Sequence, residues 1–340
     1  MKYTLIIAVY NRLDEIIEFL ASAEQLEFDR KEFEILFVDD GSNDGFLQHL
    51  ENYSSVSGLN FRFITQKNKG PGEARNNGMR NSSSDYFIFN DSDLLYPTNY
   101  LRKIDDALIK HDYDAFGGPD DCHPSFSPLL KAINYAMTSF IGTGGTRGSD
   151  KSVSKKFYPR SFSMGIKKEV FKNIGGMNQL RHGQDMDFSA RIYEAGYKVG
   201  LISDAIVYHK RRTSLKRFYK QIFNWGVARI NLGKMHEGML KPVHFLPAAI
   251  VLFSILIPIS AIFIPFMIVF LYIGITGFFG VLLLAFVQSF MKYKILKTSF
   301  LSMITLLIQV YAYGFGTWSG LLQTLKGNKV AKGFTKDYYK

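Results

Sequence analysis

The sequence predicts an α/β domain built on a mainly parallel sheet and followed by transmembrane helices. Over the first hundred residues, short β-rich apolar runs alternate with segments of helical periodicity. Each of these runs ends in polar residues. Further along the chain, residues 245–290 are almost free of charge and are too long for one membrane span of about 20 residues.

The alternation in the first hundred residues has the spacing of βαβ units. The expected strands are residues 5–9, 33–38, 61–65 and 86–89. The expected helices are residues 14–26, 44–53, 72–80 and 97–110. Crossovers between parallel strands are right-handed, so the carboxyl ends of these strands should lie along one edge of the sheet.

The middle of the chain is less regular. Residues 112–154 are rich in Gly, Pro, Ser and Asp, and they are expected to be irregular, with a flexible loop at 142–148. Helical patterns return at residues 168–174 and 185–195, and residues 205–208 are expected to form a strand.

The last third of the chain predicts a membrane region. Residues 206–340 contain 17 Lys and Arg against 2 Asp and Glu, and these basic residues flank the apolar stretches. We expect two spans within residues 245–290 that turn near Pro265. The positive-inside rule then places the α/β domain and the lysines after the second span in the cytoplasm. A third apolar stretch, residues 298–325, precedes a basic tail, residues 326–340.

The third apolar stretch is ambiguous. Gly314, Gly316 and Gly320 weaken a straight helix. A re-entrant or interfacial segment, or a tight pair of short spans, would keep the basic tail in the cytoplasm. A single span would carry the tail outside and break the positive-inside rule. The sequence leaves these alternatives open.

The same features narrow the expected partners. The basic residues follow the apolar segments and no nucleic-acid motif is present, so membrane lipids are expected and nucleic acid is not. Cys122 is the only cysteine, so the chain forms no intramolecular disulfide, which is consistent with a reducing compartment.

All four expected strands in the first hundred residues end in polar residues, which should form one crevice at the carboxyl edge of the sheet. These ends are Tyr10-Asn11-Arg12, Asp39-Asp40-Gly41-Ser42, Lys69-Gly70-Pro71-Gly72 with Glu73-Ala74-Arg75-Asn76, and Asn90-Asp91-Ser92-Asp93. The residues at the fourth strand end most clearly indicate a metal site. Asp91 and Asp93 are separated by one residue. Side chains two residues apart on an extended segment point to the same side. Their carboxylates suit one Mg²⁺ or Mn²⁺ ion that bridges two phosphates.

Asp39 and Asp40 offer carboxylates that can accept hydrogen bonds from a nucleotide base or a ribose. A turn and helix cap that uses the residues after them is the plainer interpretation, and both can hold. Arg75 can bind phosphate or base, although an arginine on its own is more often a surface residue.

Asp185 and His209 are the remaining candidates. Asp185 lies at the start of an expected helix, where it is either the N-cap or a base that removes a proton from an acceptor hydroxyl. His209 follows an expected strand and either completes a metal site, contacts phosphate, or has a structural role.

Taken together, these segments resemble the family 2 glycosyltransferases, which have the GT-A fold. The resemblance covers residues 3–226 and rests on the ordered set of five motifs. These are Ala8-Val9-Tyr10-Asn11-Arg12, Val38-Asp39-Asp40-Gly41-Ser42, Gly72-Glu73-Ala74-Arg75-Asn76, Asp91-Ser92-Asp93 and Gln184-Asp185.

The resemblance implies a role for each matched residue. A nucleotide sugar is expected to contact Ala8, Tyr10, Arg12, Asp40, Arg75 and Asp91, with Asp40 on the base, usually uracil. Mg²⁺ or Mn²⁺ is expected on Asp91, Asp93 and His209, with Asp93 as the more direct ligand. Asp185 matches the position of the catalytic base.

Two departures from the family pattern narrow the activity. The usual Glu-Asp pair is Gln184-Asp185, which keeps the base but loses a charge. Gln221-Ile222-Phe223-Asn224-Trp225 is similar to the Q-x-x-R-W motif of processive synthases, with Asn in place of Arg. This difference and the few membrane segments favour a transferase of single sugars over a polymer-extruding synthase.

The expected protein is therefore an inverting, metal-dependent hexosyltransferase in surface polysaccharide or glycoconjugate assembly. It would transfer sugar from a nucleotide sugar, of the UDP type, to a glycan or lipid-linked acceptor. Two alternatives are transfer to polyprenyl phosphate and a catalytically silent membrane scaffold. The expected organisation is a GT-A domain (1–226), a basic connector (227–244), a membrane region (245–325) and a cytoplasmic tail (326–340).

Overall fold

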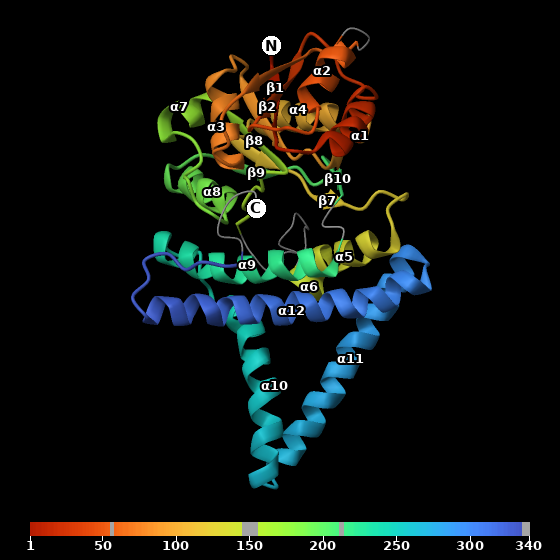
Figure 1. Cartoon of the computed structure of the whole chain (residues 1–340), viewed down its shortest axis with the longest axis vertical. Coiled ribbons are helices and arrows are strands. Elements are labelled where there is room, and N and C mark those ends of the chain that lie inside the picture. Colours follow the sequence, from red (N-terminus) through yellow and green to blue (C-terminus); the bar gives the residue numbers. More distant parts are fainter. Residues whose placement is uncertain (55–57, 145–155, 211–213, 335–340) are drawn as a thin grey trace. The chain divides into compact units, whose positions relative to one another are not determined.

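The computed structural model describes the whole chain apart from residues 55–57, 145–155, 211–213 and 335–340 (Figure 1). Its residues form two compact units. The α/β unit runs to Lys210 and contains the described strands with helices α1–α4, α7 and α8. The helical unit contains α5, α6, the 3₁₀ helix η1 and α9–α12.

The α/β unit is built on a seven-stranded sheet of order β3-β2-β1-β4-β8-β6-β9. The strands in that order are Phe61–Thr65, Phe33–Asp39, Tyr3–Val9, Tyr86–Asn90, Ser163–Lys167, Ala115–Gly117 and Val199–Leu201. All neighbours pair in parallel except β8, which is antiparallel to both β4 and β6. The predicted mainly parallel sheet is confirmed, and the four predicted strands are β1–β4.

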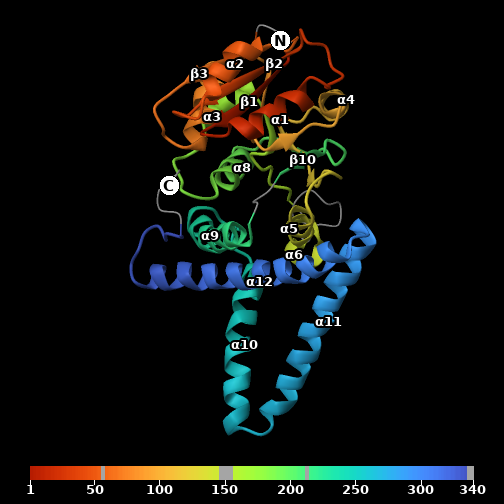
Figure 2. The same ribbon diagram turned by 45° about the vertical axis from the view of Figure 1, so that its right-hand side comes forward.

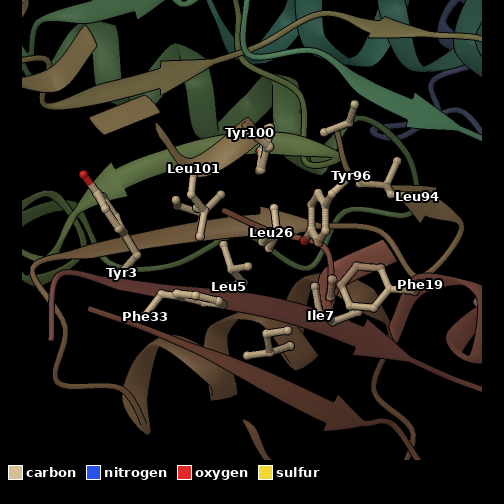
Figure 3. Packing of buried hydrophobic residues seen from close by; sticks show 14 of the residues in the cluster. Tyr3, Leu5, Ile7, Phe19, Leu26, Phe33, Leu94, Tyr96, Tyr100 and Leu101 are labelled. Carbon is tan, nitrogen blue, oxygen red and sulfur yellow. The ribbon is translucent and has the colours of Figure 1, made fainter. Parts of the chain in front are cut away.

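Helices cover both faces of this sheet, because successive side chains of each strand point to opposite sides. Tyr3, Leu5 and Ile7 of β1 pack in one core with α1 (Leu13–Ala23), α2 (Phe46–Ser54) and α4 (Tyr100–His111). Figure 3 shows this core. Ile6 packs in the other core with α3 (Pro71–Arg80), α7 (Lys168–Ile174) and α8 (Gln184–Glu194). The six corresponding helix predictions agree with these bounds to within three residues.

A second, small sheet has the order β5-β10-β7 and was not predicted as such. Its strands are Leu94–Leu95, Val207–His209 and Asp120–Asp121. Strands of two or three residues are too short to leave a period in the sequence. Only β10 was expected, from residues 205–208.

The helical unit contains α5 (Pro128–Thr138), α6 (Phe140–Thr143), α9 (Leu215–Met235), η1 (Pro242–Phe245), α10 (Leu246–Phe263), α11 (Met267–Tyr293) and α12 (Leu296–Leu325). The expectation that residues 112–154 are irregular is wrong for α5. Ser127 caps that helix by accepting a hydrogen bond from Leu130 N, and Pro128 fits its first turn. Of the expected loop at 142–148, residues 145–148 lie outside the described residues.

Three helices of the described chain are long and apolar enough to cross a membrane: Pro242–Phe263, Met267–Tyr293 and Leu296–Leu325. The predicted turn near Pro265 lies between α10 and α11. The third apolar stretch is one continuous helix, so a pair of short spans is wrong. Its glycines do not break it, because they face neighbouring helices. A Cβ at Gly316 would lie 2.1 Å from Phe223 O of α9. Residue 226, the expected domain boundary, lies inside α9, which packs along α12 (Figures 1 and 2).

Candidate active site

The D-x-D segment forms the loop that leaves β4 at the carboxyl edge of the sheet. Asn90, the last residue of β4, is fully buried and anchors this loop. Its Nδ2 donates to Phe162 O at 2.9 Å, and its Oδ1 accepts from Tyr96 OH at 3.0 Å. Asp91 and Asp93 follow and are partly exposed. A fixed strand end thus presents two carboxylates that solvent can reach.

Strand β10 brings His209 to the same loop. His209 pairs with Leu94 of β5, and Lys210 N donates to Asp93 O at 2.8 Å. His209 Nε2 lies 3.0 Å from Asp93 Oδ1 and 4.0 Å from Asp91 Oδ2. One ligand atom from each of these three side chains lies within 4.8 Å of the others. The three residues expected to hold the metal are therefore neighbours.

Asp120, on β7, holds His209 from the other side of its ring. Its Oδ2 lies 3.2 Å from His209 Nδ1, and its side chain is fully buried. An acceptor on Nδ1 favours the tautomer that leaves Nε2 free to bind a cation, as in carboxylate–histidine–metal sites. Burial lowers the pKa of His209, but the nearby carboxylates of Asp93 and Asp120 outweigh it and raise the pKa to about 9. A proton therefore competes with a cation for Nε2.

Glu15 of α1 is a further carboxylate near this loop. Its Oε2 accepts a hydrogen bond from Ser92 Oγ at 3.1 Å. Burial, and then the negative charge of Asp93, raise the pKa of Glu15. Glu15 therefore adds a third carboxyl group beside Asp91 and Asp93.

Arg75 of α3 contacts the D-x-D segment directly. Its NH2 group lies 2.6 Å from Asp91 Oδ1, and its side chain is only 8% exposed. Arg75 Nε makes no hydrogen bond within the described part of the chain. Arg75 is therefore not the surface arginine that its residue type alone would suggest. It places a buried positive charge beside the candidate metal ligands.

Asp40 has a different environment from Asp91. It is fully buried at the end of β2, where it accepts hydrogen bonds from Gln66 Nε2, Lys69 N and Gly70 N at 2.7–2.8 Å. These bonds fix the segment that leads into α3. Its predicted contact with the donor base stays a prediction.

The end of β1 lies beside the end of β2. Asn11 has a left-handed backbone (φ 51°), and its Oδ1 accepts from Asn43 N at 2.8 Å. Ala8, Tyr10 and Arg12 are partly exposed around it. Their expected contact with a nucleotide sugar is compatible with this position but stays a prediction.

Asp185 is the second residue of α8, and the structure decides one alternative about it. Gly183, with φ 81°, is the N-cap of this helix, so the interpretation of Asp185 as the cap is wrong. Asp185 is partly exposed. The segment is held against α3, because a Cβ at Gly72 would lie 2.5 Å from the Gln184 side chain. α3 thus carries Arg75 and also packs against the start of α8.

Asn76 supplies a second link between α3 and the chain that leads to α8. Its Nδ2 donates to Met177 O at 2.9 Å, and its Oδ1 accepts from Met177 N at 2.7 Å. Of the expected site residues, Arg75, Asp91, Asp93 and His209 are linked by contacts within 4.0 Å. Among the residues that the structure describes, the Asp185 side chain makes no hydrogen bond or ion pair with this group. Asp120 was missed, since it lies in a segment expected to be irregular. The signal that could have found it is its position just after Ala115–Gly117, a short strand of the same sheet.

This fold and site define a class of protein. A mainly parallel sheet whose carboxyl edge carries a D-x-D pair and a histidine is the arrangement of the GT-A glycosyltransferases. In structure, the chain is similar to the mannosyltransferase PcManGT from Pyrobaculum calidifontis, solved with GDP-Man and Mn²⁺. The TM-score is 0.56 at 15% sequence identity, over 91% of this chain and 85% of that one. This likeness concerns the fold.

The chain belongs to glycosyl transferase family 2, whose sequence model matches residues 4–175. A glycosyl transferase family 21 model also matches residues 157–318. The chain is 25% identical over 260 residues to the glycosyltransferase AglE of Haloferax volcanii, which covers 72% of this chain and 83% of AglE. It is 34% identical over 221 residues to the poly(ribitol-phosphate) β-N-acetylglucosaminyltransferase TarS of Staphylococcus aureus, over 62% of this chain and 35% of TarS. The protein is therefore a membrane-anchored family 2 glycosyltransferase.

Proposed function

We propose that this enzyme transfers a single sugar from a UDP-sugar to a hydroxyl of a glycan or lipid-linked glycan, with inversion at the anomeric carbon. The observation that carries the proposal is the convergence of Asp91, Asp93 and His209 beside the buried Arg75. Such a cluster suits the diphosphate of a nucleotide sugar, which needs both a cation and an arginine. One relative is named as a poly(ribitol-phosphate) β-N-acetylglucosaminyltransferase and another as a succinoglycan biosynthesis protein, which supports an acceptor of the cell-surface polymer class.

The residues present fit a divalent cation. Two carboxylates and one imidazole with ligand atoms within 4.8 Å suit Mn²⁺ or Mg²⁺, and Asp120 orients the imidazole. We propose that Asp91, Asp93 and His209 hold this ion. When bound, it would stabilise the negative charge that develops on the leaving diphosphate. The solved mannosyltransferase of similar fold carries Mn²⁺ with its nucleotide sugar, which supports this choice.

Side chains of the protein remove the proton, bind the phosphates and position the nucleotide. Asp185 takes the proton of the acceptor hydroxyl as its oxygen forms a bond to the anomeric carbon. The bond from that carbon to the diphosphate oxygen breaks, and its electron pair leaves with the nucleoside diphosphate. Arg75 donates hydrogen bonds to the phosphates, while Asp40 and the end of β1 (Ala8, Tyr10 and Arg12) position the nucleotide. A single displacement of this kind inverts the configuration.

The membrane anchor supports a lipid-linked acceptor and a location at the cell membrane. Lys292, Lys294 and Lys297 follow α11 directly, and the positive-inside rule places them, with the catalytic unit, in the cytoplasm. Nucleotide sugars would reach the site from that compartment.

The test is release of nucleoside diphosphate by the full chain in detergent, with a panel of UDP- and GDP-sugars and lipid extract as acceptor. We expect one UDP-sugar to support release with Mn²⁺ or Mg²⁺, and EDTA to abolish it. Asp93→Asn should lower kcat/KM at least about 100-fold, because the loss of an outer-shell partner alone costs 10–100-fold. Asp185→Asn should lower kcat while donor binding, measured by calorimetry, is kept. Asp106→Asn, an exposed carboxylate on α4, is the matched control.

The outcomes separate the alternatives. Release without any metal requirement would contradict the proposed cation site. Release from a GDP-sugar alone would overturn the choice of donor. Donor binding without release, with every acceptor extract, would favour a silent scaffold that keeps the fold.

A further inference from the structure

We propose that α12 lies along the membrane surface and does not cross it, so that α10 and α11 are the two spans of the described chain. This proposal rests on the membrane anchor and not on the proposed donor or reaction. The starting point is the α10–α11 hairpin. No Asp, Glu, Lys or Arg occurs from residue 242 to 291, and Lys241 and Lys292 flank this segment. Only 11% and 6% of the apolar windows of the two helices are buried.

The two ends of this hairpin define one side of the membrane. α10 begins where α11 ends, because the chain turns back at residues 264–266. α11 has 27 residues and is about 40 Å long, and α10 with η1 reaches about 33 Å at the same rise. Both lengths are enough for a hydrocarbon core of about 30 Å. The start of α10 and the end of α11 therefore lie near the same membrane surface.

α12 contacts both of these ends. Ser302 Oγ lies 2.7 Å from Ser289 Oγ, in the last turns of α11. Trp318 Nε1 donates to Ala248 O, in the first turn of α10, at 2.9 Å. Ser302 and Trp318 are 16 residues apart, so about 24 Å of helix separates them. In a spanning helix these two residues would lie near opposite surfaces. Here both touch residues at one surface, and Figures 1 and 2 show α12 running across the open end of the hairpin.

The side chains of α12 suit a helix with lipid on one face. Large apolar residues are exposed on one side of both the first and the last turns of the helix. These residues are Leu296, Phe300, Ile304, Phe315, Leu322 and Leu325. The buried face instead carries small and polar residues, including Thr298, Ser302, Thr305, Gln309 and Thr317. An exposed apolar stripe on one face is the pattern of an interfacial helix.

α9 packs along α12. It exposes Lys216, Arg217, Lys220 and Lys234, which suit anionic lipid headgroups. The aromatic groove between the two helices, about 590 Å³, is lined by Tyr219, Phe223, Phe315 and Trp318 and ends at Lys326. Tyr and Trp are enriched at membrane–water interfaces. An in-plane α12 also keeps the basic residues after it on the side of Lys292, which satisfies the positive-inside rule.

The first test is the sidedness of three single cysteines in the full chain carrying Cys122→Ser. The positions are Ile264→Cys in the hairpin turn, Lys292→Cys at the end of α11 and Asn328→Cys after α12. A membrane-impermeant maleimide is applied to intact cells and again after permeabilisation. We expect Asn328→Cys to be labelled together with Lys292→Cys, and Ile264→Cys to be labelled under the opposite condition. Labelling of Asn328→Cys together with Ile264→Cys would show that α12 crosses the membrane.

The second test separates an in-plane helix from a re-entrant one. A fluorophore is attached at Phe300→Cys, Phe315→Cys or Leu322→Cys in the same background, and its depth is measured with lipids that carry a quencher at known depths. We expect the three positions to be equally shallow. The control series Tyr272→Cys, Phe279→Cys and Val287→Cys on α11 should show steadily changing depth. A gradient along α12 like that along α11 would overturn the proposal. Both tests read membrane position, so they succeed or fail independently of sugar transfer.

Discussion

The sheet of the α/β unit buries its large apolar side chains, whereas α12 of the helical unit exposes several of its own. In the α/β unit, Leu5, Phe37 and Phe89 are completely buried in the sheet. In the helical unit, α12 buries Thr298 and Ser302 and exposes Phe300 and Ile304. Water drives large apolar groups inward, whereas lipid exerts no such force, so helices in lipid pack through small residues and hydrogen bonds. The burial pattern therefore records which solvent each surface meets.

Buried polar groups also serve different purposes in the two units. In the α/β unit, buried Arg75 and Asp120 contact the candidate metal ligands. In the helical unit, hydroxyls join neighbouring helices, as Ser289 does with Ser302. The first set is tied to chemistry and the second to packing. Each of the substitutions below has a partner variant that separates these roles.

The largest difference in stability should come from comparing Phe→Ala in the sheet core with Phe→Ala on the exposed surface of α11. Phe37 is buried in β2 and packs edge-on against Phe19, Phe46 and Phe61. Phe37→Ala should lower the free energy of unfolding by about 3–5 kcal/mol, from lost transfer energy and the cavity left behind. Phe279, on α11, is 62% exposed. Phe279→Ala should change it by no more than about 0.5 kcal/mol.

The measurement is denaturant unfolding of the purified full chain in detergent micelles. Near-ultraviolet circular dichroism would follow the aromatic side chains of the α/β unit. Equal losses for the two variants would contradict the assignment of α11 to lipid, because they would place Phe279 in a protein core.

A smaller loss of stability is expected at the contact of α9 with α12, where Gly316 lets the two helices pack closely. A Cβ at Gly316 would lie 2.1 Å from Phe223 O, so Gly316→Ala must push the two helices apart. Overpacking of this kind costs about 1–3 kcal/mol. Gly277 of α11 has no atom within 4 Å of an added Cβ, so Gly277→Ala is the control. Thermal unfolding in detergent should show a lower Tm for the first variant and an unchanged or slightly higher Tm for the second.

Asp120 tests the buried polar groups of the α/β unit. Because Asp120 lies behind the His209 ring and outside the group of three candidate ligands, Asp120→Asn should weaken Mn²⁺ binding by about 10–100-fold without unfolding the chain. Titration of Mn²⁺ by electron paramagnetic resonance measures this directly and needs no substrate. Asp121→Asn, on the neighbouring residue of β7, is the matched control. Unchanged Mn²⁺ affinity in Asp120→Asn would remove Asp120 from the site.

The fold was largely predictable because its signals are local. The alternation of strands and helices specified β1–β4 and α1–α4, and the uncharged segment specified the α10–α11 hairpin. The D-x-D pair could be predicted as well, since Asp91 and Asp93 follow a clear strand. The proximity of Arg75 and Asp91, which follow β3 and β4, needed only the rule that parallel strand ends share an edge.

What could not be predicted depends on tertiary contacts. Asp120 and His209 meet through β7 and β10, strands of two and three residues that leave no period in the sequence. For α12 the sequence left a membrane span and an interfacial segment open. Its hydropathy resembles that of a membrane span, and only contacts with both ends of the hairpin distinguish it from one. The expected turn after β2 is present, since Ser42 N donates to Asp39 Oδ1 at 2.9 Å. Asp40 instead accepts from Lys69 N and Gly70 N, and its contact with the donor base stays a prediction.

The smallest effect should come from a single hydroxyl between helices. Thr305 Oγ1 is buried and donates to Ala132 O of α5 at 2.9 Å. Thr305→Val keeps the shape and removes the donor, so it should cost about 0.6 kcal/mol and no more than about 1.7 kcal/mol, the mean and the largest value measured for such bonds in a membrane protein. Thr276→Val, at an exposed position of α11, should have no destabilising effect. Thermal unfolding of the two variants in the same detergent compares them. A greater loss for Thr276→Val would mean that the exposed face of α11, and not the buried face of α12, makes the polar contacts of the helical unit.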